Sequence, residues 1–212
     1  MKIVALVGVD GTGKTTQARN LVAKLGVTGF RAKYVRPVFL IFDPYRLSTG
    51  RRLGLATSPR MVRLRMEESR GGKLRYGFPI ATMVKIIGYF YAIVVYSYLR
   101  VFLRKEQFVV CDRYFYQYFY DVFGSGARRI ALSFPRPDFV FWLDGTIELI
   151  RARIDEPPSR NGDIAYIESV VRLYRDLSQD LSFVRIDAGI NRQSIANTIW
   201  QTVIERVRRC ET

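Results

Sequence analysis

The first sixteen residues constrain the fold more than any other part of the sequence. An apolar run at positions 2–7 ends in Gly8, and a glycine-rich turn then leads to Lys14, Thr15 and Thr16. The turn fits the pattern GxxxxGK[ST] in the setting that this pattern requires, with a buried strand before it and a helix after it. Glycines let backbone N–H groups turn toward phosphate oxygens, and the positive end of the helix dipole favours the same anions. The sequence therefore predicts a loop that binds the phosphates of a nucleoside triphosphate.

The residue types within this loop predict which residues contact the phosphates and which contact the metal ion. Lys14 supplies a positive charge for the β- and γ-phosphates, and Thr15 offers a hydroxyl oxygen to Mg²⁺, the cofactor that we expect together with ATP as phosphoryl donor. We expect ATP to be bound by Gly8, Asp10, Gly11, Thr12, Gly13, Lys14, Thr15 and Thr16. The sequence contains no NKxD motif, which disfavours a GTPase, and a single short domain disfavours a translocating ATPase.

Strand-like and helix-like segments alternate along the chain. Short apolar runs predict strands at 2–7, 32–38, 107–112, 138–144 and 182–187. Longer segments predict helices at 13–25, 79–104, 147–154, 164–181 and 194–208. This alternation indicates an α/β fold, a three-layer P-loop NTPase sandwich with a central parallel sheet of about five strands. The whole chain, residues 1–212, is expected to form one domain.

Composition excludes several classes of mechanism and suggests an anionic partner. The chain has no histidine, which rules out histidine-based triads, dyads and zinc sites, and its two cysteines, Cys111 and Cys210, are far apart. The net charge of +15 favours nucleotides, nucleic acid or an anionic membrane as partners. The uncharged run at 86–99 is shorter than the roughly 20 residues of a membrane span. We therefore expect a cytoplasmic protein without a transmembrane helix.

Several segments, in order along the chain, resemble the thymidylate kinase family. The loop at 8–16 is similar to the family pattern GxDGxGK[ST][ST], and residues 109–114 (VVCDRY) are similar to its strand-DR[YH] signature. Residues 137–144 resemble its PDLxxxLD strand, and residues 184–188 its last strand and adenine-side loop. The resemblance implies a kinase that transfers the γ-phosphoryl group of ATP to a nucleoside monophosphate, most directly dTMP to dTDP.

The DRY segment supplies the next set of expected site residues. The resemblance gives Asp112 a catalytic role and a place in the Mg²⁺ shell with Thr15. Asp144 also ends an apolar strand, and the residue pattern alone does not separate the two acids. Acceptor binding is expected from Arg36, Arg113 and Tyr114. An arginine beside a phosphate can hold it through two parallel hydrogen bonds.

A basic segment at about 151–161 resembles the lid that closes over ATP in this family. Members of this family carry a catalytic arginine either in the phosphate loop or in the lid. Position 12 of this chain is threonine, so the resemblance implies that the lid supplies the arginine. The candidates are Arg151, Arg153 and Arg160. Arg151 and Arg153 are two positions apart, so a helix would point them to different sides.

The acceptor-side region, about 39–105, departs from the family pattern. The acid that usually follows the second strand is missing, and Asp43 is a possible substitute. The helical position near Tyr91, where the family carries a phosphate-binding arginine, has none, and the stretch 114–123 holds seven aromatic residues. The aromatic segment 89–123 can therefore be core, dimer interface or acceptor pocket. The basic cluster at 46–75 can replace the missing phosphate-binding arginine, or it can contact nucleic acid or lipid.

These departures keep two alternatives open. One is a kinase of the same fold with another acceptor, a nucleoside, a sugar or a membrane-linked phosphate. The other is a nucleotide-binding or nucleic-acid-binding protein without catalytic activity, which the net charge supports. A homodimer is a further possible assembly.

Overall fold

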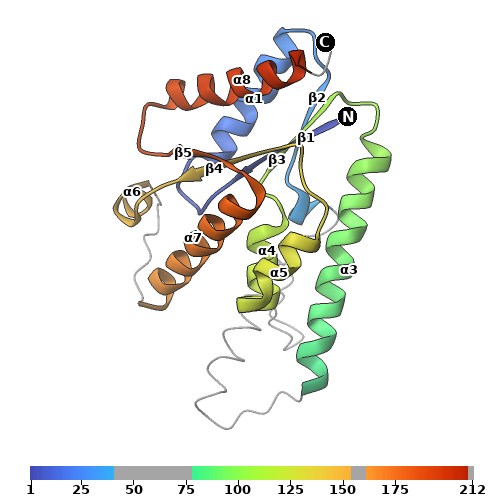
Figure 1. Cartoon of the computed structure of the whole chain (residues 1–212), viewed down its shortest axis with the longest axis vertical. Coiled ribbons are helices and arrows are strands. Elements are labelled where there is room, and N and C mark those ends of the chain that lie inside the picture. The colour runs from blue at the N-terminus through green and yellow to red at the C-terminus, as the bar shows by residue number, and fades with distance from the viewer. Residues whose placement is uncertain (41–77, 154–160, 210–212) are drawn as a thin grey trace, which may run out of the picture.

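A single five-stranded parallel sheet forms the centre of the protein. The computed structural model describes residues 1–40, 78–153 and 161–209. The strands are β1 (Lys2–Val7), β2 (Ala32–Val35), β3 (Phe108–Asp112), β4 (Phe139–Asp144) and β5 (Val184–Asp187). They lie in the order β2-β3-β1-β4-β5, and every neighbouring pair is parallel (Figure 1). The expected α/β class and parallel sheet of about five strands are confirmed.

Helices cover both faces of this sheet and give three layers (Figure 1). One face carries α1 (Lys14–Val27) and α8 (Arg192–Arg208). The other carries α3 (Phe78–Phe102), α4 (Phe115–Phe123), α5 (Ala127–Ser133) and α7 (Asn161–Leu181). Shorter elements are the 3-10 turns η1 (Pro37–Phe39) and η3 (Gly124–Gly126) and the helix α6 (Ile147–Arg153).

The alternation of side chains along β1 divides the interior into two cores. Ile3, Ala5 and Val7 pack into the core under α3, α4 and α7. Val4 and Leu6 point to the opposite face and pack into the core under α1 and α8. The helix after β1 thus lies on one face, and those after β3 and β4 lie on the other. A crevice at the carboxyl ends of such strands is the usual ligand site of an open parallel sheet.

Two local features differ from the sequence-based expectations. The second strand ends at Val35, not at residue 38, because Pro37 begins the turn η1 and cannot donate to a strand neighbour. The helices α4 and α5 were not predicted. The aromatic residues of α4 favour strands by propensity, and α5 has only seven residues. The rings of Tyr114, Phe115 and Phe119 are fully buried, so this part of the aromatic segment is core.

The helix α3 packs closely on α4 at Gly88. A Cβ atom on Gly88 would lie 2.9 Å from Cγ1 of Val122, and the Tyr118 hydroxyl donates to the Gly88 carbonyl at 3.2 Å. Residues Lys85–Phe102 are long and apolar enough to cross a membrane on length and composition. On its inner side, however, α3 buries Val95 and Leu99 completely against the fold.

Candidate active site

The loop between β1 and α1 adopts a conformation that depends on its glycines. Gly8 has φ +142°, and a Cβ there would lie 2.5 Å from the Leu143 carbonyl oxygen. Gly13, the N-cap residue of α1, has φ +89° in the left-handed region. Gly13 offers no side chain to cap the helix, so the first N–H groups of α1 are left to an incoming anion. The Thr12 hydroxyl donates to the Val9 carbonyl at 2.8 Å and holds the loop closed.

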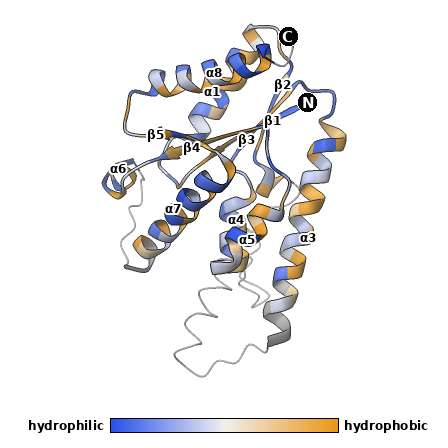
Figure 2. Cartoon of the chain, in the orientation of Figure 1, coloured by the Kyte–Doolittle hydropathy of each residue, from blue (hydrophilic) through white to orange (hydrophobic). Residues whose placement is uncertain are grey.

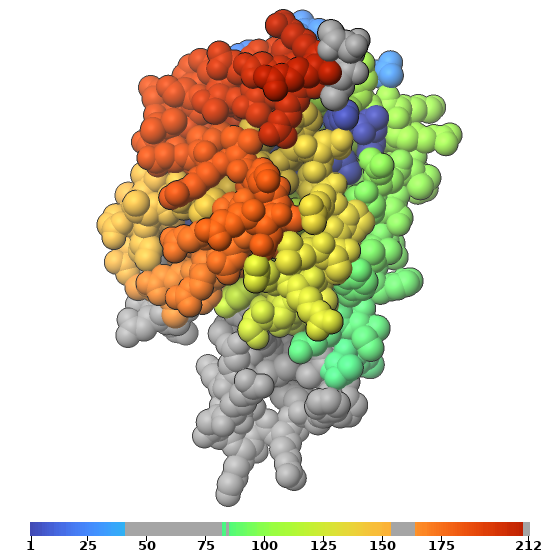
Figure 3. Space-filling view, viewed as in Figure 1, coloured from blue at the N-terminus to red at the C-terminus, as the bar shows by residue number. Residues whose placement is uncertain are grey.

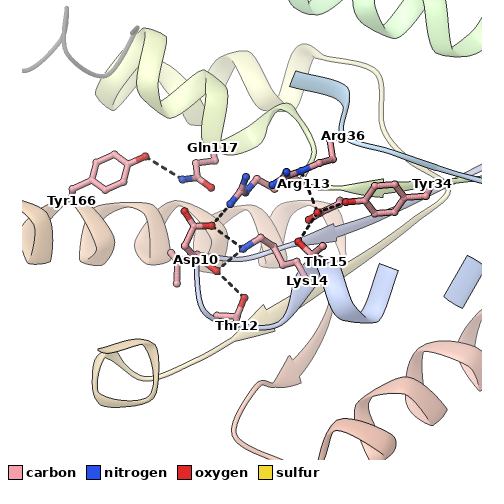
Figure 4. A network of polar contacts seen from close by, with 11 residues as sticks. Asp10, Thr12, Lys14, Thr15, Tyr34, Arg36, Arg113, Gln117 and Tyr166 are labelled. Atoms are coloured by element: carbon pink, nitrogen blue, oxygen red, sulfur yellow. Dashed lines mark hydrogen bonds and ion pairs between the residues drawn. The ribbon is translucent and has the colours of Figure 1, made fainter. Parts of the chain in front are cut away.

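Lys14 is buried under this loop. Its Nζ donates to the Val9 carbonyl oxygen at 2.5 Å and lies 3.6 Å from Oδ1 of Asp10 (Figure 4). Burial lowers the pKa of Lys14 to about 8, and the attraction of Asp10 offsets only part of this effect. The ammonium group is therefore poorly solvated in the protein and would gain strongly from phosphate oxygens placed beside it.

The lowered pKa of Lys14 predicts that nucleotide affinity depends on pH. Only the charged lysine attracts a triphosphate, so ATP affinity should hold below pH 8 and fall by up to about tenfold per pH unit above it. Bound phosphates raise the pKa again, so binding above pH 8 should take up one proton. Calorimetry in buffers of different ionisation enthalpy measures that proton. Lys14→Ala should bind without this uptake, and an equal uptake in the variant would contradict the assignment to Lys14.

Asp112, the last residue of β3, is buried and joins three elements. Its Oδ2 accepts hydrogen bonds from the Thr15 hydroxyl at 2.6 Å and the Tyr34 hydroxyl at 2.7 Å (Figure 4). The Arg36 Nε lies 3.4 Å from the same oxygen. The other oxygen, Oδ1, is buried and has no hydrogen-bond partner among the described residues. A buried carboxylate oxygen without a partner needs a cation or a donor beside it.

The residues around Asp112 fit a Mg²⁺ ion held together with a nucleotide. Mg²⁺ in phosphate-transfer sites usually takes one or two protein ligands and completes its shell with water and phosphate oxygens. The free Oδ1 of Asp112 and the hydroxyl of Thr15 supply such a pair. Within residues 1–40, 78–153 and 161–209 no three His, Cys, Asp or Glu side chains cluster, so a metal cage made of protein alone is not present there.

Asp144, the competing acid, has a different partner. Its Oδ2 accepts from Nε of Arg185 at 2.9 Å and lies 2.6 Å from Nη2 of the same guanidinium. Both guanidinium nitrogens contact this one carboxylate oxygen, and the arginine charge offsets that of Asp144. Asp112 is therefore the better candidate for the metal. The sequence alone could not separate the two acids, because it does not show which of them pairs with an arginine.

Arg113 follows Asp112 in the left-handed conformation, with φ 67°. This turn brings its guanidinium to the loop, where Nη2 donates to the Asp10 carboxylate (Figure 4). Burial by itself raises the pKa of Asp10, but the charges of Lys14 and Arg113 outweigh it, so the pKa lies below its ordinary value. The Nε of Arg113 is buried without a partner among the described residues. Arg113 thus has donor capacity left for an anionic ligand.

The left-handed backbone at position 113 can be tested with two truncations. Arg113→Gly and Arg113→Ala both remove the guanidinium, but only alanine keeps the steric conflict of a Cβ at positive φ. We expect Arg113→Gly to be more stable than Arg113→Ala by about 1 kcal/mol. Urea unfolding of the two variants measures the difference. Equal midpoints would show that residue 113 leaves this conformation once its side chain is gone.

A cavity of about 270 Å³ opens beside Arg113, between the loop, η1, α4 and α7. It is lined by Asp10, Val38, Phe39, Arg113, Tyr114, Gln117, Tyr118, Asp121 and Tyr166. The Tyr166 hydroxyl donates to Oδ1 of Asp121 at 2.7 Å and accepts from Nε2 of Gln117 at 3.2 Å. The Oε1 atom of Gln117 is buried and lacks a partner in the described part of the chain. The cavity combines an arginine, aromatic walls and an open hydrogen-bond acceptor.

Of the three residues expected to bind the acceptor, Arg113 and Tyr114 line this cavity and Arg36 does not. Arg36 is not a wall residue, but it is half-exposed beside one, with its guanidinium carbon 5.2 Å from the centre of the Phe39 ring. Tyr114 lines the cavity, but its ring is fully buried and its hydroxyl donates to the Pro135 carbonyl at 2.7 Å. Its side chain packs in the core, and its contact with an acceptor stays a prediction.

The arginines expected from the lid are not brought to the loop. Arg151 and Arg153 are both exposed on α6, and Nη1 of Arg153 donates to the Ala188 carbonyl at 3.0 Å. No contact within the described ranges joins either of them to Lys14 or Asp112. Arg160 and most of the segment 151–161 lie outside the described residues, as do Asp43 and the basic cluster 46–75.

A larger cavity of about 870 Å³ lies at the ends of β4 and β5, beside α6 and α7. Its wall includes Asp144, Thr146, Arg172, Arg175 and Asp187. It adjoins the glycine loop, because a Cβ on the wall residue Gly145 would lie 3.2 Å from Cγ2 of Thr12. The loop is thus bordered by a large polar cavity on one side and a smaller aromatic cavity on the other.

Sequence reasoning missed four residues of the site: Tyr34, Gln117, Asp121 and Tyr166. Of these four, only Asp121 could have been identified from the sequence, because an acid within an aromatic run needs a polar partner once that run is buried.

No model of a known protein family matches the chain, and no curated protein matches it either.

Proposed function

We propose that the protein is a P-loop kinase that transfers the γ-phosphoryl group of ATP to an acceptor phosphate. The observation that carries the proposal is the hydrogen bond from Thr15 to the buried Asp112 next to the buried Lys14. It joins the start of α1 to the end of the adjacent strand and leaves one carboxylate oxygen open. A glycine loop, a lysine, a hydroxyl and a strand-end acid are the parts that phosphoryl transfer from a nucleoside triphosphate requires.

The residues of the loop would bind and orient the donor. Backbone N–H groups of residues 8–16 would hold the phosphates, and Lys14 would neutralise charge on the β- and γ-phosphates. Asp112 and Thr15 would hold Mg²⁺, which when bound draws electron density from the phosphate oxygens. An acceptor oxygen forms a bond to the γ-phosphorus while the bond to the β–γ bridging oxygen breaks, and ADP leaves. Alignment and charge neutralisation account for most of the rate in such a reaction.

A nucleoside monophosphate is the acceptor that we propose first, with dTMP the member that the sequence resemblance implies. Arg113 supports this choice, since it lies between the loop and the smaller cavity and keeps an unused donor. The open Oε1 of Gln117 can accept from an N–H of a base, and the aromatic wall can stack on it.

A second acceptor class is favoured by Tyr91. Its side chain is buried, and its hydroxyl donates to the Val38 carbonyl at 2.7 Å beside the cavity. A core tyrosine therefore occupies the position that resembles the place of a phosphate-binding arginine. A kinase of this fold that accepts a nucleoside or a sugar would need no arginine there, because such an acceptor carries no phosphate. A membrane-linked phosphate would need its cation from another position.

The test is phosphoryl transfer from Mg-ATP to a panel of nucleoside monophosphates and nucleosides, with Lys14→Ala as the inactive control. Turnover on dTMP that disappears in the control supports the first acceptor. Turnover on nucleosides alone favours the second class. A protein that binds ATP tightly but transfers to none of these would move the search to sugar and lipid phosphates, and one that does not bind ATP would refute the proposal.

A further inference from the structure

The exposed apolar side chains of the protein are concentrated on α3. Ten large hydrophobic residues are exposed in the described part of the chain, and eight of them are on this helix. They are Met83, Ile86, Ile87, Phe90, Val94, Tyr98, Val101 and Phe102. The most exposed are Phe102 at 68% and Phe90 at 67%. A patch of this kind on a soluble fold usually marks an interaction surface.

These side chains form one continuous outer face of α3. Residues 83, 87, 90, 94, 98 and 101 are spaced by three or four positions, which is the spacing of a single helical face. The face runs over about 18 residues, or about 27 Å of helix. The opposite side packs into the core through Val95 and Leu99. In Figure 1 the helix lies along the edge of the molecule, and Figure 2 colours many of its residues as hydrophobic. In Figure 3 its atoms, in green, lie at the outer edge of the space-filling view.

The charges around this face favour an anionic partner. Residues 78–102 contain no acidic residue, whereas Lys85 lies near one end of the face and Arg100, Arg104 and Lys105 near the other. All four basic residues are exposed. A second copy of this chain, at +15, would bring like charges together across the face. An anionic bilayer instead offers hydrocarbon to the apolar side chains and negative headgroups to the basic ones.

We propose that α3 docks the protein on an anionic lipid bilayer, with its outer face in the interfacial region and its inner face still packed on the fold. The helix lies along the surface and does not cross the membrane, because crossing would strip Val95 and Leu99 from the core. The proposal does not depend on the kinase assignment. It concerns a different surface from the site around Lys14 and Asp112.

Co-sedimentation of the full chain with vesicles tests the proposal. The vesicles contain phosphatidylglycerol and phosphatidylcholine in equal parts, and pure phosphatidylcholine vesicles are the comparison. Phe90→Asp/Val101→Asp should weaken vesicle binding by at least about tenfold. Val27→Asp/Ile190→Asp is the matched control, because it makes the same kind of change at exposed apolar residues away from α3. Its binding should stay within about twofold of the parent protein.

The parent protein should bind the anionic vesicles, bind pure phosphatidylcholine weakly, and lose binding as salt is raised. Equal binding by the two double variants would overturn the proposal, as would failure of the parent protein to bind. Sedimentation velocity without lipid tests a second copy of the chain as the partner. A stable dimer of the parent protein that Phe90→Asp/Val101→Asp disrupts would assign the face to a second copy and overturn the proposal. Lys14→Ala should still bind vesicles, so failure of docking and failure of the kinase proposal remain distinguishable.

Discussion

Lys14→Met should abolish phosphoryl transfer and at the same time make the free protein more stable. Removal of the charge that neutralises the β- and γ-phosphates should lower the rate by at least about 10³-fold. The melting temperature of the nucleotide-free variant should nevertheless rise by about 5–10 °C. A substitution that lowers activity but raises stability indicates that the original side chain binds a ligand at a cost to the stability of the free protein.

The gain in stability follows from the environment of the ammonium group. Burial moves the pKa of Lys14 from 10.5 to about 8, so the folded protein holds this charge at a free-energy penalty. At about 1.4 kcal/mol per pKa unit, the penalty is about 3–4 kcal/mol. Methionine fills a similar volume without a charge. The Val9 carbonyl, which loses the lysine, keeps the hydrogen bond from the Thr12 hydroxyl.

Thermal unfolding at several pH values checks this account. The folded-state pKa is below the unfolded one, so the penalty is complete below pH 8 and disappears as the pH rises toward 10.5. The difference in melting temperature between Lys14→Met and the parent should therefore shrink from pH 8 to pH 10. A difference that does not change over that range, or a variant less stable than the parent, would contradict the account.

Asp112→Asn should lower the rate of transfer by about 10²- to 10³-fold with little change in the fold. Asparagine keeps the shape and can still accept the hydrogen bonds of Thr15 and Tyr34. It removes the negative charge that the open Oδ1 would offer to a cation. The Mg²⁺ concentration needed for half-maximal activity should rise in parallel.

The chain contains a matched control for this change in Asp144→Asn. Asp144 also ends a strand of the same sheet, but Arg185 pairs with it. Its substitution should alter the rate by less than about tenfold and leave the Mg²⁺ requirement unchanged. Steady-state rates over a Mg²⁺ titration compare the two variants. If Asp144→Asn shifted the Mg²⁺ requirement and Asp112→Asn did not, the metal roles of the two acids would be reversed.

The sequence predicted the sheet and one side of the site because that information is local. The strand before Gly8 and the helix after Gly13 follow from adjacent residues, and so do the roles expected of Lys14 and Thr15. All five strands were also placed correctly to within a few residues, since buried parallel strands have short apolar runs. These features depend on spacing alone.

The other side of the site depends on contacts between distant segments. Tyr34 reaches Asp112 across 78 positions, and Tyr166 reaches Asp121 across 45. Nothing in the residues around 166 indicates such a partner. The choice between Asp112 and Asp144 likewise rests on Arg185, which meets Asp144 only because β4 pairs with β5. Pairings of this kind follow from topology, and sequence periodicity does not encode them.

The missing side chain at Gly88 couples two surfaces that face in different directions. Gly88 sets how near α3 approaches α4, and its carbonyl accepts the hydrogen bond of Tyr118, a wall residue of the smaller cavity. Any larger residue at this position would push α3 outward and shift Tyr118 with it, because a Cβ there would already crowd Val122. One position thus determines both the width of the cavity and the height of the apolar face above the fold. In the evolution of this chain, changes in the molecule that fills the cavity and changes in the surface that α3 contacts would not be independent.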